Sequence, residues 1–205
     1  MVLDDRAFAA LGELDQGWRP SINRDKGHPA SRSLDSLLLR EPTLADELTI
    51  RLAQRELEAD GFIFAFGLAP ETPWNDFLDR LRRLREGRDM PDGLVGSTFL
   101  VAEVDGEIVG STSLRYELNE YLATFGGHIG YCVRPAFRRM GYATAMLENM
   151  LARAEERGIS RALVTCLDSN VASAGVIERA GGALEGLVTR DDGEIFRRYW
   201  FQLGD

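Results

Sequence analysis

The sequence is poor in the residues that build disulfide frameworks and metal sites. Only two cysteines and two histidines occur among its 205 residues, and neither cysteine belongs to a Cys-x-x-Cys or Cys/His ligand pattern. Cys132 and Cys166 each lie in an apolar run that predicts a buried strand, where a free cysteine acts as a small core residue. The composition therefore argues against a disulfide-rich scaffold, and we expect no metal.

The chain also lacks an excess of positive charge and a long apolar stretch. Lys and Arg number 24 and Asp and Glu number 33, which gives a net charge of -9. Nucleic acid and anionic membranes select basic surfaces, so neither is an expected partner, whereas a cationic amine would not be repelled. No run approaches a membrane span, and the start, with Asp4 and Asp5, lacks the apolar core of a signal peptide. These absences predict a cytoplasmic protein.

The remaining composition is that of one soluble domain preceded by an extension. At 44% hydrophobic, the chain can bury a sizeable core. Residues 1–36 are expected to be a loop-rich N-terminal extension, because a polar run from Pro20 to Ser33 follows one candidate helix at residues 3–14. Residues 37–205 are expected to form a single domain, since no internal repeat or second boundary occurs in them.

Apolar spacing and end signals predict the elements before the centre of the chain. A short strand is expected at residues 37–39, and a helix should follow Thr43. A second helix has Thr72 as its N-cap, Pro73 at its first position and Gly87 after its end. One face of the first helix carries Leu44, Leu48 and Leu52, and the buried face of the second carries Trp74, Phe77, Leu78, Leu81 and Leu84.

Two hairpins are predicted from their turn residues. Asp105-Gly106 is among the strongest two-residue hairpin signals, and it separates two β-rich runs. A later turn at residues 191–193 separates another pair. The predicted strands of the two hairpins are Ser97 to Val104 with Glu107 to Leu114, and Ala183 to Thr189 with Glu194 to Leu203.

The centre of the chain reads strand, turn, helix, strand. The first strand, Gly127 to Val133, is stopped by Pro135, and the second runs from Ala162 to Leu167. Gly158 is placed as a left-handed C-cap for the helix between them. Two strands joined by a helix imply a parallel crossover, which puts the turn before the helix at the carboxyl edge of a sheet. The apolar stripe of this helix is Ala143, Met146, Leu147, Met150, Leu151 and Ala154.

The turn that enters this helix has the features of an anion site. Backbone N–H groups at a helix start lack partners and carry partial positive charge, so a phosphate is a natural ligand. Gly141 and Ala143 keep the approach clear of side chains, and Arg138 and Arg139 add cationic donors. The dinucleotide pattern Gly-x-Gly-x-x-Gly and the P-loop pattern Gly-Lys-Ser/Thr are both absent here.

These residues resemble the GNAT superfamily of acyl-CoA-dependent N-acetyltransferases, most of all a bacterial subgroup of predicted acetyltransferases. The family pattern Arg/Gln-x-x-Gly-x-Gly/Ala after a strand ending Val-x-Pro is matched by Val133, Pro135, Arg138, Gly141 and Ala143. A second family element, an Asn opening the next helix, is matched by Asn170 with Gly181-Gly182 after that helix. The resemblance covers residues 37–203. It implies a mixed α/β fold with a central, mostly antiparallel sheet, helices on both faces and a splayed parallel strand pair that holds the cofactor.

The resemblance also implies acetyl-CoA as the acyl-donor co-substrate and a binding role for particular residues. The pantetheine arm would add like an extra strand beside Tyr131, Cys132 and Val133, where a backbone N–H could also stabilise an oxyanion. Asn170 and Ser173 would hold the arm from the other side. The pyrophosphate would be held by the backbone of Arg138, Arg139, Met140, Gly141, Tyr142, Ala143 and Thr144.

Proton handling is the least determined part of the predicted chemistry. Many family members carry a Tyr seven residues after the Asn as general acid, but this position is Ile177 here. Glu120 and His128 are the candidate bases, and the unperturbed pKa of a histidine, about 6.5, suits proton abstraction. His128 could equally be a packed strand residue, and Glu120 a solvated loop carboxylate. Tyr131 and Tyr199 are candidate acids.

The resulting hypothesis is an acetyltransferase that moves an acetyl group from acetyl-CoA to a primary amine, in a small molecule, a lysine or an N-terminus, by direct attack. The alternatives are a non-catalytic acyl-CoA-binding module and an acyltransferase that uses another acyl-CoA donor. The acceptor is expected to be bound by variable segments, and homodimerisation is expected from the resemblance alone. Those segments are Phe62 to Pro70, Tyr116 to Phe125 and the last hairpin.

Overall fold

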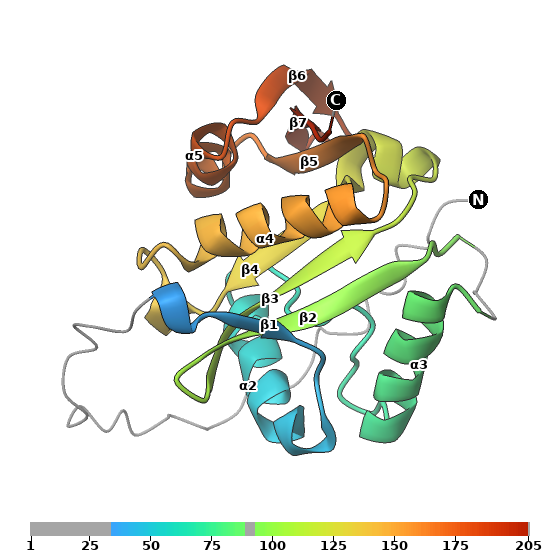
Figure 1. The fold of residues 1–205 in the computed structure, drawn as a ribbon, viewed down its shortest axis with the longest axis vertical. Helices are drawn as coiled ribbons and strands as arrows, with labels where there is room; N and C mark the ends of the chain where they lie inside the picture. Colours follow the sequence, from blue (N-terminus) through green and yellow to red (C-terminus); the bar gives the residue numbers. More distant parts are fainter. Residues whose placement is uncertain (1–33, 89–92, 205) are drawn as a thin grey trace. The chain divides into compact units, whose positions relative to one another are not determined.

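The described residues form two antiparallel β-sheets with helices around them (Figure 1). The structure is a computed structural model that describes residues 34–88 and 93–204, so the candidate helix at residues 3–14 lies outside the described residues. The first sheet has the strand order β1-β2-β3-β4. Its strands are β1 (Leu38–Arg40), β2 (Ser97–Val104), β3 (Glu107–Arg115) and β4 (Ile129–Val133).

The second sheet has the strand order β5-β7-β6. It consists of β5 (Arg161–Leu167), β6 (Ala183–Thr189) and β7 (Ile195–Gln202). β5 follows β4 along the chain after one helix, yet the two strands belong to different sheets. The mixed fold with a mostly antiparallel arrangement is therefore confirmed, and the place where β4 and β5 separate becomes the feature of interest.

Both predicted hairpins are present. β2 and β3 pair through the turn at Asp105 (φ 51°) and Gly106 (φ 79°). Two successive residues with positive φ match a type I′ turn, whose twist suits the flanking strands. β6 and β7 pair around a turn that contains Gly193 (φ 87°). In both cases the turn residues identified from sequence join the paired strands, and each ladder has one register shift, between Ala102 and Glu103 and between Leu184 and Gly186.

Helices cover both faces of the first sheet (Figure 1). α2 (Glu47–Glu58) and α3 (Trp74–Glu86) lie on one face, and α4 (Tyr142–Glu156) lies on the other. α5 (Val171–Arg179) packs with the second sheet beyond α4. Short helical turns complete the chain: η1 (Leu34–Ser36), η2 (Leu44–Asp46), the π-helical turn η3 (Leu122–Gly126) and η4 (Pro135–Phe137).

The leucines of η2 and α2 show that residues on one side of a helical segment are not always buried. Leu44, Leu48 and Leu52 do share one side, but their exposed fractions are 68%, 83% and 42%. The residues that α2 buries are Ile50, Ala53, Gln54 and Leu57. The buried face of α2 thus lies apart from the leucine stripe, because the packing of α2 on the sheet decides which side is covered.

The predicted start of α3 is wrong by one residue. Pro73 is the N-cap, and the side chain of Thr72 makes no capping bond to the helix. Instead, its Oγ1 accepts a hydrogen bond of 3.1 Å from the N–H of Ala69 in the preceding loop. A threonine hydroxyl can accept a hydrogen bond either from a helix N-terminus or from a local turn, and here it accepts from the turn.

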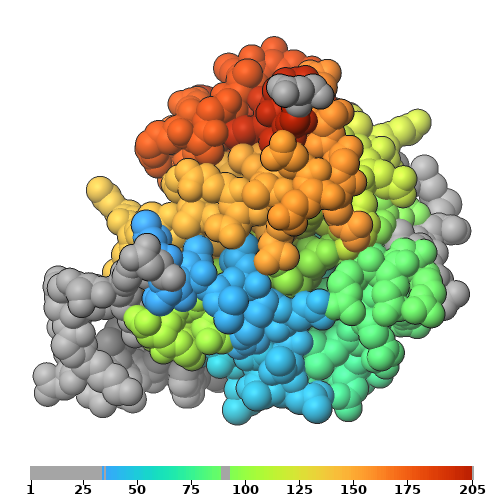
Figure 2. Space-filling model, viewed as in Figure 1, coloured from blue at the N-terminus to red at the C-terminus, as the bar shows by residue number. Residues whose placement is uncertain are grey.

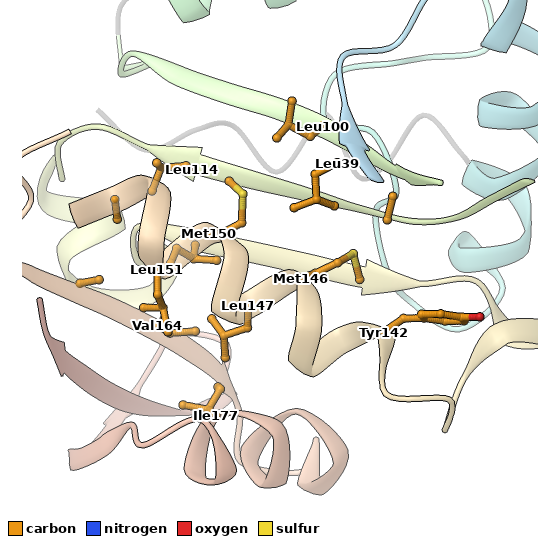
Figure 3. Packing of buried hydrophobic residues seen from close by; sticks show 14 of the residues in the cluster. Leu39, Leu100, Leu114, Tyr142, Met146, Leu147, Met150, Leu151, Val164 and Ile177 are labelled. Atoms are coloured by element: carbon orange, nitrogen blue, oxygen red, sulfur yellow. The ribbon is translucent and has the colours of Figure 1, made fainter. Parts of the chain in front are cut away.

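α4 is the central helix of the core, and its predicted apolar stripe is buried from Met146 to Ala154, whereas Ala143 is half-buried (Figure 3). In Figure 3, Met146 and Met150 point toward the first sheet, whereas Leu147 and Leu151 point toward Val164 of the second. α4 therefore fills the space between the two sheets and sets how far apart they stand. The cluster around it includes Leu39, Leu100, Leu114, Tyr142, Ala154, Val164 and Ile177.

The end of α4 also follows the prediction from sequence. Gly158 has a left-handed φ of 79°, and the N–H of Ile159 donates to the carbonyl of Ala154 at 3.0 Å. This bond closes the last turn in the manner of a Schellman cap.

Among the described residues, no helix combines the length and apolarity needed to cross a membrane.

Candidate active site

β4 and β5 are joined at one end by His128, the residue just before β4. Its N–H donates to the carbonyl of Leu163 at 2.7 Å, and the N–H of Leu163 donates to the Nδ1 atom of His128 at 3.0 Å. Gly127 allows this approach, since a Cβ on it would lie 2.6 Å from the Leu163 carbonyl oxygen. The joint thus depends on a glycine and on a histidine ring that completes the backbone pairing.

Beyond this joint the two strands form no ladder with each other. β4 pairs with β3, and the bonds from Arg115 N–H to His128 O (2.8 Å) and from Arg134 N–H to Val109 O (2.9 Å) fix which residues face β3. Because hydrogen-bonded positions alternate along an antiparallel strand, Tyr131 and Val133 turn their N–H and C=O groups away from β3. They face the gap toward β5, where the splayed pair was predicted.

The turn after β4 bends the backbone so that several N–H groups converge. Arg139 has a φ of 66° and Gly141 a φ of 87°, so two left-handed residues stand within three positions. Left-handed φ is uncommon for a non-glycine residue and is concentrated at functional turns. Alternation of such residues with ordinary ones forms a concave nest of N–H groups that binds anions.

α4 begins immediately after this nest without a side-chain cap. Gly141 is the N-cap residue, and the first backbone bond of the helix runs from Ala145 N–H to Gly141 O at 3.1 Å. The N–H groups of Tyr142, Ala143 and Thr144 precede that bond and point out of the helix start. Together with the positive end of the helix dipole, they can hold a phosphate.

One of the two arginines in the turn is already engaged within the protein. Arg138 forms an ion pair of 2.7 Å with Asp60, and its Nε donates to the carbonyl of Val133 at 3.2 Å. Arg139 is exposed. η1 lies beside the start of α4 (Figures 1 and 2), and a Cβ on Gly141 would be 3.1 Å from a methyl of Leu34. Any anion bound here therefore has Arg138 and Leu34 as neighbours, and Met140 is half-buried beside them.

Asn170 and Ser173 face the same gap from the β5 side. Asn170 caps α5, because its Oδ1 accepts a hydrogen bond of 3.0 Å from the N–H of Ser173. This cap leaves the Nδ2 amide hydrogens of Asn170 able to donate elsewhere. The Oγ of Ser173 is 2.9 Å from the hydroxyl of Tyr131, so a hydrogen bond connects β4 to α5 across the gap. Burial raises the pKa of Tyr131 to about 12, so its hydroxyl keeps its proton at neutral pH.

Of the two cysteines predicted to be buried, Cys166 is buried and Cys132 is half-buried. Burial raises the pKa of the Cys132 thiol to about 11, and its Sγ is 3.1 Å from the Oγ of Ser111. Cys166 is buried in β5, and burial raises its pKa as well. Neither thiol carries the lowered pKa of a nucleophile. In the part of the chain that the structure describes, no group of three acidic, histidine or cysteine residues is arranged to hold a metal ion.

The two predicted bases occupy different settings. His128 is buried, and its Nδ1 already accepts the Leu163 N–H, so the proton of the neutral ring lies on Nε2. Desolvation and, to a lesser degree, the charge of Arg115 lower the pKa of His128. A ring in this state has no free lone pair for an ammonium proton, which favours the structural role. Glu120 is exposed just before η3.

The other candidate acid and the missing family tyrosine are also located. The hydroxyl of Tyr199 donates to Glu178 Oε1 at 2.8 Å, and burial raises its pKa. Ile177 is fully buried in the core around α4. The hydroxyl of Tyr131 instead reaches α5 at Ser173, which lies one helical turn before Ile177.

The segments expected to bind an acceptor meet the sheet on the face opposite α4. Ser111 donates through Oγ to the carbonyl of Phe64 at 2.7 Å, which ties the loop after α2 to β3. The Oγ1 of Thr165 donates to the carbonyl of Phe125, which ties η3 to β5. Arg198 of β7 donates to the carbonyl of Thr124 at 3.1 Å. The loop after α2 is thus tied to β3, and η3 is tied to both β5 and β7.

Two surface hollows lie away from this gap. One, between α3 and the first two strands, is lined by Glu41, Leu78, Phe99 and neighbours. The other lies beside the C-terminal half of α4 and is lined by Leu114, Met150 and Arg157 among others. Neither hollow includes the N–H groups of β4 or of the α4 start, so the candidate site rests on those backbone groups.

One charged residue near the gap was missed by the sequence reasoning. Arg115, the last residue of β3, lies on the same face as Ser111 and Ser113. Strand alternation from Ser111 is the signal that assigns it to that face. The pairing of β3 with β4 then decides that its neighbour is Gly130, and no feature of the sequence predicts this.

Comparisons with known proteins find similar sequences and similar folds. The family model described as acetyltransferase (GNAT) family matches residues 54–182. An acetyltransferase of Pectobacterium atrosepticum is 33% identical over 108 residues, which are 52% of this chain and 67% of that protein.

Two solved structures show the same fold. The microcin C7 self-immunity acetyltransferase MccE, in complex with acetyl-CoA and AMP, has a TM-score of 0.60 at 17% identity, over 82% of this chain and 93% of that one. The putative acetyltransferase yncA of Salmonella typhimurium, with its cofactor acetyl-CoA, has a TM-score of 0.58 at 16% identity, over 83% and 95%. At these identities the likeness concerns the fold alone.

Proposed function

The chain belongs to the acetyltransferase (GNAT) family, and we propose that it transfers the acetyl group of acetyl-CoA to a primary amine by direct attack. The observation that carries this proposal is the open edge of β4, which leads directly into the uncapped start of α4. An edge of N–H and C=O groups followed by an anion-binding turn fits a ligand with an amide-bearing arm and a pyrophosphate. Acetyl-CoA has both parts.

The residues along the gap suit the two parts of acetyl-CoA. The amides of the pantetheine arm can pair with Tyr131 and Val133 as an added strand would. The pyrophosphate can be held by the N–H groups between Arg139 and Thr144. The amide of Asn170 is available to the arm from the β5 side. Acetyl-CoA complexes among proteins of the same fold support this assignment.

Acetyl transfer requires oxyanion stabilisation, a proton for the leaving thiolate and a base for the ammonium. The amine nitrogen attacks the thioester carbonyl, and the N–H of Tyr131 faces the gap where it can stabilise the oxyanion, an effect worth roughly 3 to 4 kcal/mol per donor. The C–S bond then breaks, and the hydroxyl of Tyr131, which keeps its proton at neutral pH, can donate to the leaving thiolate. The ammonium must lose a proton before attack, and Glu120 remains the candidate base.

The first test is a calorimetric titration of the purified protein with acetyl-CoA, CoA and NADH. We expect micromolar binding of acetyl-CoA and CoA, because the nest and the strand edge are built for the diphosphate and the arm, and no response to NADH. A thiol-release assay with a panel of amines follows. If acetyl-CoA does not bind, the turn is only a helix start and the proposal fails.

The same assay separates the two alternative functions. A non-catalytic acyl-CoA-binding module is favoured by Ile177 in the usual position of the acid and by the engaged ring of His128. It would bind acetyl-CoA without acceptor-dependent thiol release. An acyltransferase with another donor would work as fast or faster with a longer acyl-CoA at fixed acceptor, whereas strict use of acetyl-CoA would reject that alternative.

A further inference from the structure

Arg115 stands at the end of β3 with its guanidinium over Gly130 of β4. A Cβ on Gly130 would come within 3.5 Å of Nη1 and 3.7 Å of Nη2 of Arg115. The same Cβ would lie 3.2 Å from the Oγ of Ser113. The absence of a side chain at position 130 therefore makes the space that the guanidinium occupies.

This guanidinium has no acidic partner among the described residues. Its Nη1 donates two long hydrogen bonds, to the carbonyls of Gly126 at 3.3 Å and Gly127 at 3.4 Å. Within the described chain, its Nε and Nη2 groups make no hydrogen bond and are not sealed from solvent. Three further donors thus have no acceptor in the described part of the chain and remain open to a ligand.

Two other arginines that are not exposed are neutralised by a carboxylate, whereas Arg80, of intermediate burial, lies over the Phe77 ring and donates to the carbonyl of Phe66 at 2.7 Å. Arg134 is buried and forms a two-pronged pair with Glu56, at 2.8 and 2.9 Å. Arg198, of intermediate burial, pairs with Glu185 at 2.6 Å. Burial lowers the pKa of Arg115, and the nearby Tyr121 opposes that shift only in part. A half-buried cation without a counter-ion is unfavourable, which indicates that a negative group is missing from this place.

The position of Arg115 near the expected reaction centre indicates which molecule could carry the missing negative group. Gly130 directly precedes Tyr131, whose N–H faces the gap, and one strand residue spans about 3.3 Å. On the α4 side the gap is filled by packed residues, including Ile129 and Val164. An acceptor must therefore approach over Gly130 and Cys132, along the face that carries Arg115.

We propose that Arg115 binds a carboxylate of the acceptor, so that the acceptor is an amino acid or a close relative with its carboxylate a few bonds from the reacting amine. The proposal rests on the proposed acetyl transfer and adds its substrate class. A guanidinium binds a carboxylate in a two-pronged geometry, and this contact would fix the amine beside the acetyl carbon. Polyamines lack this group, as do lysine side chains away from a chain terminus, so both are disfavoured.

An apolar side chain on the acceptor is the natural first choice. The loop after α2 carries Phe62, Ile63 and Phe66 with exposed fractions of 38%, 51% and 61%. The same loop is tied to the Arg115 face through the bond from Ser111 to the carbonyl of Phe64. Exposed apolar groups on a loop tied to the same strand as the cation suit an amino acid with an aromatic or aliphatic side chain.

The test compares acceptors that differ only at the carboxylate. L-phenylalanine, L-phenylalaninamide and phenethylamine form one set, and the other amino acids and their amides form the rest of the panel. Thiol release from acetyl-CoA gives kcat/KM for each. We expect the acid to exceed its amide by about ten- to hundredfold for the preferred side chain. The amine of the amide is less basic and so more fully deprotonated at neutral pH, which means that amine reactivity cannot produce this preference.

Arg115→Gln and Arg198→Gln form a matched pair of variants. Both arginines donate to carbonyls of one segment, Arg198 to Thr124 and Arg115 to Gly126 and Gly127. If Arg115 binds the acceptor, its Gln variant loses the preference for the acid while acetyl-CoA affinity and activity on the amide change little. Arg198→Gln keeps the preference. If Arg115 only fastens this segment, both variants lower acid and amide activity together.

The outcomes separate this inference from the proposed function. Equal or better use of amides and simple amines overturns the carboxylate role but leaves the acetyltransferase proposal intact. If acetyl-CoA binds but no amino acid releases thiol, calorimetry of the CoA-loaded protein with N-acetyl-L-phenylalanine and the other N-acetyl amino acids decides. Absence of binding there overturns the inference, and binding that Arg115→Gln abolishes supports it. If acetyl-CoA itself does not bind, both proposals fail.

Discussion

At the closed end of the gap between β4 and β5, two hydrogen bonds tie His128 to Leu163, whereas at the open end the N–H groups of Tyr131 and Val133 face no strand. Buried backbone groups need partners, and the closed end supplies them from the protein itself. The open end leaves them to a ligand. The comparison shows how one strand pair is fixed at one end and kept receptive at the other.

The largest expected effect comes from breaking the closed end. His128→Leu removes the acceptor of the Leu163 N–H and should lower the free energy of unfolding by about 2 to 3 kcal/mol, because a buried donor is left unpaired. Urea unfolding measures this loss. His128→Asn is the matched control, since Oδ1 of an asparagine can accept in place of Nδ1.

The same pair of variants tests the catalytic role of His128. The asparagine variant should recover at least half of the lost stability and retain acetyl transfer. Equal destabilisation by both variants would show that packing of the ring, and not the hydrogen bond, is what matters. Loss of turnover in a folded His128→Asn protein would instead restore the histidine as a base.

The open end is tested next by placing a negative charge at the α4 start. Ala143→Asp should weaken acetyl-CoA binding about hundredfold, roughly 2.7 kcal/mol, because a carboxylate beside the nest repels the pyrophosphate. The helix itself should keep its stability, since an acidic residue in the first turn interacts favourably with the helix dipole. Calorimetry measures the affinity, and the uncharged Ala143→Asn shows the effect of size alone. An affinity equal in both variants would mean that the phosphates bind elsewhere.

Tyr131 tests chemistry at the open end without disturbing binding. Tyr131→Phe should lower kcat for thiol release about tenfold while acetyl-CoA affinity stays the same. The effect is modest because a thiolate whose pKa is near that of a free thiol, about 8.5, can also leave unassisted. Ser173→Ala keeps the hydroxyl of Tyr131 and removes only its hydrogen-bond partner, the Ser173 Oγ at 2.9 Å. This variant should change kcat little. An unchanged kcat in Tyr131→Phe would remove the tyrosine as acid.

The smallest effect sharpens the role of Arg138. Its ion pair with Asp60 is partly exposed, with side-chain exposed fractions of 41% and 40%, so the pair adds little to stability. Asp60→Asn should release Arg138 toward the phosphates and tighten acetyl-CoA binding a few-fold, most visibly at low salt. Asp79→Asn, which removes an exposed carboxylate paired with Arg82 on α3, controls for net charge. A similar gain in both variants would indicate a general charge effect.

Local signals predicted much of the fold. Asp105-Gly106 gave a turn with two positive φ values, and Gly158 gave the left-handed end of α4. These positions are decided by neighbours in the chain, because only a few residue types tolerate a left-handed backbone. Thr72 failed as an N-cap because its hydroxyl had a competing local partner, the N–H of Ala69.

The parts of the site that needed the structure all depend on contacts between distant segments. Ser173 is 42 positions from Tyr131, and Leu163 is 35 positions from His128. No spacing rule connects such pairs. The leucine stripe of η2 and α2 is a further case, since helical period places residues on a common face but the sheet decides which face is covered.

The sequence by itself determined the strand, turn and helix from Ile129 to Glu156, together with the glycine at the start of the helix. Backbone geometry and helix polarity are local properties, so they can be recognised in a short stretch of residues. Only the tertiary structure decided that β4 and β5 separate after His128, that Tyr131 meets Ser173, and that Arg115 lies over Gly130 with no acidic partner among the described residues. Burial and charge pairing depend on which segments the core brings together, and the sequence pattern does not contain that information.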